Sequence, residues 1–179
     1  MSIRLTIMKT KQSIVRYVAA SLMAAATISA TTPVSAGDQV PFKGTVNVLI
    51  PADFGPPVPG SGGCVFNFFV TNSGNATHLG HFTGTANFIP NVCDGSYTGT
   101  YHWVAANGDS ISGPFFGQNI PTATPGVFDN VETALITSGT GRFAGASGMF
   151  QLGGQVNFNT LTAVLPWDGT ISSVGSSHH

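Results

Sequence analysis

Charged side chains are scarce in this sequence. Of its 179 residues, six are Lys or Arg and seven are Asp or Glu, so charged residues make up 7% of the chain, against about 25% in an average protein. Without a basic surplus the chain cannot neutralise many phosphates, which excludes nucleic-acid binding of the electrostatic kind. A disordered chain of the highly charged type is also excluded, because 42% of the residues are hydrophobic. We therefore expect a folded protein with no nucleic-acid partner.

Hydrophobic runs long enough to span a membrane are also missing. The longest run, YVAASLMAAATISA at 17–30, has 14 residues, whereas a transmembrane helix needs about 20. Three basic residues between 9 and 16 precede this run, and the small residues Val-Ser-Ala at 34–36 follow it, as in a signal peptide. We expect cleavage after Ala36, export to the periplasm or the extracellular space, and no membrane span in the mature form. The alternative is an uncleaved membrane anchor.

The expected mature chain, 37–179, is short for two ordinary domains. It holds two basic and seven acidic residues, and a chain of this length can bury one substantial hydrophobic core without help from a metal. We therefore expect one domain over 37–179 that follows a signal peptide over 1–36.

Cysteine is rare as well. Cys64 and Cys93 are the only two, and a cysteine pair in an exported protein most often forms a disulfide. Closing the loop between them would stabilise the fold by roughly 3 kcal/mol in the chain-entropy model. The alternative, a reactive thiol, lacks a neighbouring basic residue that would activate it.

Long helix-forming stretches are absent after residue 36, because Gly, Pro or Thr interrupts each of them. Short runs rich in Val, Phe, Thr and Tyr alternate instead with Gly-, Asn- and Pro-rich segments, which is typical of strands and turns. The predicted strands cover residues 41–50, 65–72, 78–89, 96–106, 110–117, 127–138, 149–158 and 161–171. This order predicts an all-β fold, either a sandwich or an eight-stranded antiparallel up-and-down barrel. We favour the barrel, because closure removes the exposed edges of a sheet with few charges.

Apolar and polar residues alternate within the predicted strands, so each strand has one face suited to the interior. Phe66, Phe68, Phe128 and Phe150 lie on the more apolar faces of their strands. A barrel lined by these side chains would enclose either a small hydrophobic molecule or a solid core, and the sequence leaves both alternatives open. The Pro- and Gly-rich segment 51–63 is expected to form a surface loop.

The run ITSGTGRFAGASG at 136–148 resembles the GTGxFxxAxG signature of dirigent proteins and their bacterial relatives, the allene-oxide-cyclase-like barrels. Two shorter segments, THLG at 77–80 and ANGD at 106–109, resemble features of the secreted bacterial branch in the expected order. The resemblance implies a calycin-like eight-stranded barrel that often self-associates into a homo-oligomer. It also implies stereocontrolled cyclisation or coupling in a hydrophobic cavity, although many bacterial members have no assigned activity.

The signature run itself is expected to be mainly architectural. Its glycines permit tight turns, and Phe143 and Ala146 are placed to close one end of the barrel. Arg142 is the only basic residue in that half of the chain. We expect it to contact strand-end carbonyls or a carboxylate, with a ligand contact as the alternative.

Two titratable residues are candidates for catalysis. Glu132, the only glutamate, shares a face with Phe128; if that face points inward, Glu132 is a buried acid of raised pKa, suited to acid–base chemistry. The alternative places Glu132 in water near the start of its strand. His78 is separated from Phe82 by an even number of positions, so it is expected on the same face of the strand, toward the cavity. His81 points to the opposite face, so the two histidines cannot share a metal. We expect neither a metal nor a cofactor.

Three functions are compatible with these observations. The first is a secreted barrel that binds a small hydrophobic molecule through the four phenylalanines named above and Arg142. The second is a cyclase or isomerase of the allene oxide cyclase or dirigent type, in which Glu132 and His78 act on a substrate that the cavity orients. The third is a structural or interaction module with a filled core. An ionisable group at an open cavity would favour the enzyme. An open cavity without such a group would favour the binding protein, and a filled barrel would favour the structural or interaction module.

Overall fold

The computed structural model describes residues 38–172. The expected signal peptide lies outside the described residues. Within them, ten strands and one short 3-10 helix, η1, follow one another in the order β1 (Gln39–Pro41), β2 (Gly44–Leu49), β3 (Phe68–Ala76), β4 (Gly80–Pro90), β5 (Ser96–Ala105), β6 (Ser110–Pro121), β7 (Val127–Ile136), β8 (Ser138–Gly139), η1 (Gly141–Phe143), β9 (Gly148–Asn157) and β10 (Thr162–Ser172).

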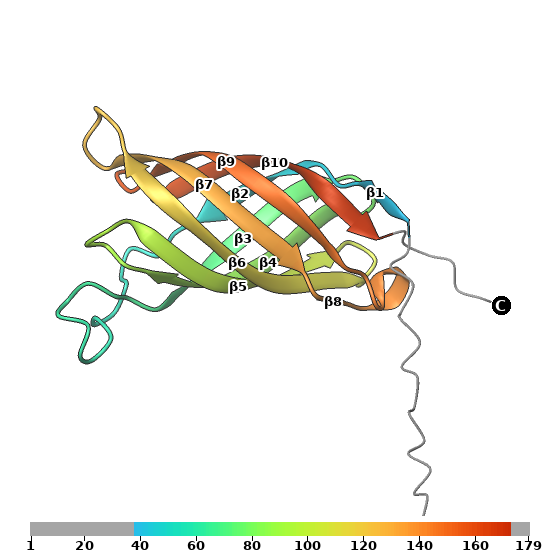
Figure 1. The fold of residues 1–179 in the computed structure, drawn as a ribbon, viewed down its shortest axis with the longest axis horizontal. Coiled ribbons are helices and arrows are strands. Elements are labelled where there is room, and N and C mark those ends of the chain that lie inside the picture. Colours follow the sequence, from blue (N-terminus) through green and yellow to red (C-terminus); the bar gives the residue numbers. More distant parts are fainter. Residues whose placement is uncertain (1–37, 173–179) are drawn as a thin grey trace, which may run out of the picture. The chain divides into compact units, whose positions relative to one another are not determined.

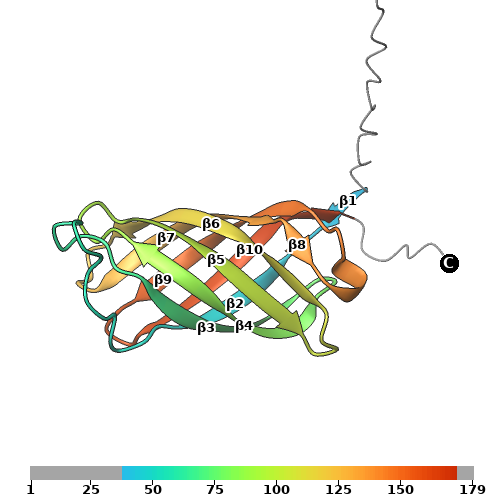
Figure 2. The ribbon, with the colours of Figure 1, turned by 90° about the horizontal axis from the view of Figure 1, so that it is seen from below.

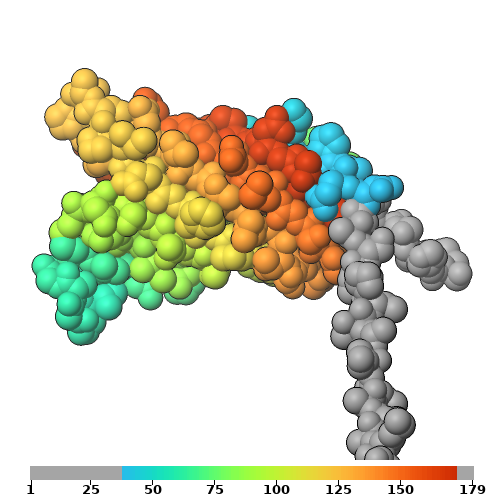
Figure 3. Space-filling model, viewed as in Figure 1, coloured from blue at the N-terminus to red at the C-terminus, as the bar shows by residue number. Residues whose placement is uncertain are grey.

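Eight of these strands close into an antiparallel barrel (Figures 1 and 2). From β2 to β7 each strand pairs with the next, β7 then pairs with β9, β9 with β10, and β10 returns to β2. The short strands β1 and β8 extend the sheet beside β10 and β6. The predicted all-β, eight-stranded up-and-down barrel is confirmed. Side chains cover the wall formed by β6, β7 and β9, as the space-filling view shows (Figure 3).

One departure from the predicted strands is in β6, which continues to Pro121 instead of ending at residue 117. Its last residues pair with β7, with Asn119 opposite Asn130 and Pro121 opposite Phe128. Asn and Pro usually indicate a loop. Here the Asn119 side chain is buried against Asn130, where their amides hydrogen-bond, so tertiary contacts outweigh the local preference.

The alternation of faces predicted for β7 is present in the structure. Asn130, Ala134 and Ile136 are buried, whereas Val131 between them is 58% exposed. Glu132 has the parity of the buried residues, and β7 therefore directs it to the barrel interior.

His78 does not belong to a strand. It lies in the turn before β4, which begins at Gly80, and its backbone adopts a φ of 66°. The side chain is exposed, and its Nε2 donates a hydrogen bond to the Pro41 carbonyl oxygen at 3.1 Å. The expectation that His78 faces the cavity is wrong, because the in–out alternation that suggested it begins two residues later.

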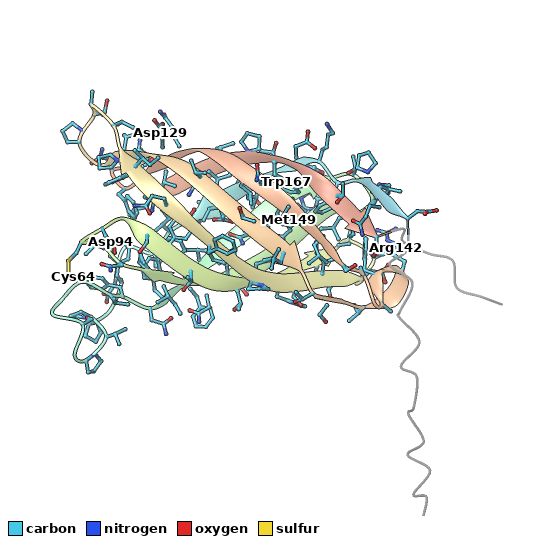
Figure 4. The ribbon with its side chains drawn as sticks, viewed as in Figure 1. Cys64, Asp94, Asp129, Arg142, Met149 and Trp167 are labelled. Carbon is cyan, nitrogen blue, oxygen red and sulfur yellow. A yellow bond between two sulfur atoms is a disulfide. The ribbon has the colours of Figure 1, made fainter. Side chains whose placement is uncertain are left out.

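The disulfide between Cys64 and Cys93 is confirmed, with 5.3 Å between the two Cα atoms. It joins the loop over residues 50–67, which we call the β2–β3 loop, to the turn between β4 and β5. Cys64 lies at the end of the barrel opposite to Arg142 (Figure 4). Among the described residues, no helix has both the length and the apolar character needed to cross a membrane.

Candidate functional site

Aromatic side chains fill the end of the barrel that lies next to η1. Phe42, Phe82, Trp103, Phe150 and Trp167 form this aromatic plug. The rings of Phe82 and Trp103 are stacked with centroids 4.5 Å apart, and Phe42 meets Phe150 edge-on at 5.4 Å. Both geometries are favourable for aromatic pairs. This end of the barrel is therefore solid.

The signature run closes the plugged end. Phe143 and Ala146 are buried there, as the sequence predicts. Gly141 has a φ of 57°, which favours glycine, and its open side is occupied by the carboxylate of Asp109. Asp109 also pairs with Arg142, whose Nε lies 3.3 Å from Oδ2.

Arg142 thus has the bridging position that the sequence predicts. Besides its ion pair with Asp109, it donates a hydrogen bond to the Leu79 carbonyl oxygen at 3.5 Å. It lines neither of the cavities described below. The alternative expectation of a ligand contact for Arg142 therefore does not agree with its position.

The middle of the barrel encloses a cavity of about 70 Å³, which we call the inner cavity. Trp103 of the aromatic plug forms part of its lining, and aliphatic side chains of β2, β3, β9 and β10 form much of the remainder. The polar side chains at its surface are Asn72, Asn130 and Glu132, beside the ring of Tyr101. A water molecule needs roughly 10–15 Å³ of such space, so the inner cavity has room for more than one small group.

A second cavity of about 100 Å³, the outer cavity, lies toward the disulfide end. It shares Phe68 and Phe158 with the inner cavity, so the two adjoin. Val92, which is 62% exposed, also lines it, so the outer cavity borders the solvent. Phe54 of the β2–β3 loop stacks on Phe68 with ring centroids 4.7 Å apart. The loop thus covers the mouth of the barrel with an aromatic ring.

The four phenylalanines named from the sequence occupy three different places. Phe68 borders both cavities, and Phe66 and Phe128 border the outer one. Phe150 belongs to the aromatic plug and lines neither cavity, so the structure contradicts its expected ligand contact. Parity correctly assigns Phe150 to the interior, but it carries no information on depth along the barrel axis.

Four further phenylalanines line the cavities and are not among the predicted site residues. Phe88, Phe115 and Phe158 lie on the inward face of their predicted strands, so the alternation pattern could have identified them. Phe54 lies in an irregular loop, where alternation gives no signal. The only indication in the sequence is an aromatic residue isolated among Pro and Gly.

Glu132 lies midway along the barrel wall, opposite Gly117 on β6 and Leu152 on β9. Its side chain is partly exposed, consistent with its place at the surface of the inner cavity. Burial among apolar groups raises the pKa of Glu132 to about 7, and a hydrogen bond with Tyr97 opposes this shift. The carboxyl group can therefore gain or lose a proton near neutral pH.

A chain of hydrogen bonds connects Glu132 with two asparagines. Tyr97 bonds to Glu132 and accepts a hydrogen bond from Nδ2 of Asn130 at 2.5 Å. The same Nδ2 donates to Oδ1 of Asn119 at 3.3 Å. Burial, and next the negative charge of Glu132, raise the pKa of Tyr97, which therefore stays protonated and serves as a donor.

Oδ1 of Asn130 has no hydrogen-bond partner among the described residues, although Asn130 is only 5% exposed. The other polar groups at the inner cavity are paired. Tyr101 donates to the Leu135 carbonyl oxygen at 3.0 Å, and the Asn72 amide, in the orientation that suits its neighbours, accepts from Trp103 Nε1 at 3.0 Å. An unpaired buried acceptor is costly, so Asn130 marks a place where a donor would be favourable.

The described residues contain no cluster of three or more His, Cys, Asp or Glu side chains that could hold a metal ion. His81 and His102 are both exposed on the outside of the barrel. The chemistry available at the cavity is therefore that of a carboxyl group, a phenol and amides.

No protein-family model and no curated protein matches the sequence. Among solved structures, the chain is similar to that of the pterocarpan synthase dirigent protein GePTS1, with 15% sequence identity and a TM-score of 0.44. The similarity covers 82% of this chain and 98% of that one. The eight-stranded barrel described above rests on the chain's own strand pairings.

Proposed function

We propose that this protein binds a small hydrophobic molecule inside its barrel. The observation that carries the proposal is the asymmetric filling of the interior, solid at one end and hollow toward the other. Apolar pockets with a few convergent polar groups are the usual form of small-molecule sites. A structural module with a filled core would not need the two adjoining cavities.

Filling the inner cavity with protein atoms tests this proposal. Ala163 is buried on β10 and lines the inner cavity, and Val164 next to it is 54% exposed. We expect benzyl alcohol to bind to the wild type and to change the fluorescence of Trp103, whose ring borders the cavity. Ala163→Leu should weaken this binding about tenfold, because its additional carbon atoms occupy the ligand's space.

Val164→Leu provides the matched control, since it adds a methylene to the outer surface of the same strand. Its affinity for benzyl alcohol should equal that of the wild type. Equal affinity in Ala163→Leu would place the bound molecule outside the inner cavity and contradict the proposal.

A cyclase or isomerase is the second candidate function, and the position of Glu132 favours it. A carboxyl group whose pKa is about 7, bonded to Tyr97 at the surface of an apolar cavity, can take a proton from a bound molecule and return it at another atom. Native mass spectrometry of protein purified from its own host should reveal a bound molecule. Deuterium uptake from heavy water into that molecule, lost in Glu132→Gln, would support catalysis, and no uptake would count against it.

Export completes the proposal, with a signal peptide over 1–36 and a single barrel domain over 37–179. The Cys64–Cys93 disulfide supports it, because such bonds persist in oxidising compartments. The intact mass of the secreted protein should equal residues 37–179 less two hydrogens. A mass that retains the first 36 residues would contradict cleavage after Ala36.

A further inference from the structure

The polar surface of the inner cavity offers hydrogen-bond acceptors and lacks a matching donor. Within residues 38–172, Oδ1 of Asn130 has no hydrogen-bond partner, and the carboxylate of Glu132 accepts a hydrogen bond from Tyr97. Asn130 and Glu132 are two residues apart on the inner face of β7, and both bond to the same Tyr97 hydroxyl. A carboxylate can accept about four hydrogen bonds. Both residues also line the inner cavity.

Among the described residues, no Lys or Arg side chain neutralises Glu132 inside the barrel. The two basic residues in the described part of the chain are Lys43 and Arg142, which pair with Asp168 and Asp109. Neither of them lines the inner cavity. A buried carboxylate without a cationic partner is costly to ionise. A ligand that brings a positive charge would supply what the protein lacks.

We propose that the inner cavity is selective for an apolar primary amine, whose ammonium group donates hydrogen bonds to Oδ1 of Asn130 and to the carboxylate of Glu132. This inference rests on the proposed binding function and specifies the ligand class. The apolar body of the amine packs against Trp103 and the aliphatic side chains that line the inner cavity.

The number of hydrogen-bond donors distinguishes an ammonium group from a hydroxyl or a carboxylate group. An ammonium group has three donors, enough for both acceptors with one in reserve. A hydroxyl group has one donor, so it can bond to Asn130 or to the Glu132 carboxylate and leaves the other acceptor unsatisfied. A carboxylate ligand brings no donor and adds a like charge beside Glu132, so it should be rejected. Aromatic rings of Tyr101 and Trp103 line the same cavity and favour a cation further.

The preference should depend on pH through Glu132. The titratable neighbours that face it are Tyr97 and Tyr101, both from β5 and both of raised pKa, while β6 and β9 place Gly117 and Leu152 opposite it. Only the carboxyl group thus changes charge between pH 5 and 8. Amine affinity should rise with pH as Glu132 ionises.

Three probes with the same benzyl or phenyl body test the inference, namely benzylamine, benzyl alcohol and benzoate. Calorimetric titration of the full chain at pH 8 should show benzylamine binding about tenfold more tightly than benzyl alcohol, as expected for one added hydrogen bond to a charged group. Benzoate should show no measurable binding. At pH 5 the advantage of benzylamine should be largely lost.

Two variants test whether Glu132 causes the preference for benzylamine over benzyl alcohol. Glu132→Gln should remove the advantage of benzylamine at pH 8. Asp129→Asn neutralises an exposed carboxylate on the same strand and should retain it. Benzyl alcohol binding as tightly as benzylamine would overturn the amine selectivity and leave the proposed binding function intact. If none of the three probes binds, both the selectivity and the binding function are overturned.

Discussion

The two ends of the barrel interior are built from similar residues for different purposes. Near η1, the aromatic plug and Phe143 leave no room, and several of these rings have essentially no exposed surface. Toward the disulfide, Phe68, Phe88 and Phe158 surround open space. One strand contributes to both ends, since β9 carries Phe150 in the plug and Val156 at the inner cavity. Composition alone therefore does not decide whether a barrel is solid; the depth of each ring does.

One group of buried polar side chains lies in the hollow part. Asn119, Asn130 and Glu132 lie in the hollow part, where they form a chain of hydrogen bonds with Tyr97. Such groups reduce stability unless each is paired. The plug provides apolar packing that can offset this cost. Stability and chemistry are thus located in separate parts of one continuous sheet.

Removing one aromatic ring from each end should give the largest difference in the loss of folding stability. Phe150→Ala should destabilise the protein by about 3–5 kcal/mol, because the ring is 1% exposed and the plug cannot collapse around the space. Phe158→Ala should cost about half as much or less, since that ring already borders a cavity. Chemical denaturation of both variants measures the difference. Equal losses would show that the two ends are packed equally well.

The disulfide should stabilise the hollow end. Replacing both Cys64 and Cys93 by serine should lower the free energy of unfolding by about 3 kcal/mol, because the unfolded chain regains the entropy of a loop closed over 29 positions. Denaturation of the variant, compared with that of the reduced wild type, measures the loss. If the serine variant and the reduced wild type are both as stable as the oxidised wild type, the disulfide does not restrict the unfolded chain.

Glu132 should make the stability of the hollow end depend on pH. Its pKa is about 7 in the folded protein and near 4.5 when unfolded, so the folded state holds the proton more strongly. The stability present below about pH 4.5 is then lost as the pH rises to about 7, by up to about 3 kcal/mol.

Glu132→Gln should remove this decline, whereas Asp129→Asn should keep it. Denaturation midpoints between pH 4.5 and 8 measure the slopes. A wild-type profile that is flat over this range, or that rises, would show that Glu132 titrates as an ordinary surface acid.

Phe54 should influence the rates of ligand binding and release more than the stability of the fold. Phe54→Ala should change the free energy of unfolding by only about 1 kcal/mol, because the ring is half-buried in a loop. Association and dissociation of benzyl alcohol should both become faster, since the ring lies over the outer cavity. Stopped-flow fluorescence measures the rates. Val58→Ala, in the same loop at 38% exposure, should leave them unchanged.

Strand alternation predicted the fold and placed Glu132 on the same face as Phe128, because a period of two is a local property of each strand. Whether that face points inward was left open by the sequence and is answered by the structure. Depth along the axis depends on strand tilt and register, which sequence alternation does not contain, and for this reason alternation could not separate Phe150 of the plug from the rings that line the cavities. His78 shows a second limit, since alternation stops where a strand stops. Phe54 shows a third, because its position depends on a long loop folding back over the barrel mouth.

In the part of the chain that the structure describes, the aromatic plug fills one end of the barrel and the outer cavity borders the solvent at the other, and a tube that opens at one end imposes an order on what enters it. Along β7, Phe128 lies at the mouth, Glu132 in the middle, and Ala134 opposite Phe150 of the plug. A molecule bound as we propose would insert its apolar end first and leave with that end last. Its polar end would then lie near the acceptors and face the entrance. Extra bulk on the apolar end would be blocked by the plug, whereas a chain attached beyond the polar end would extend toward the solvent.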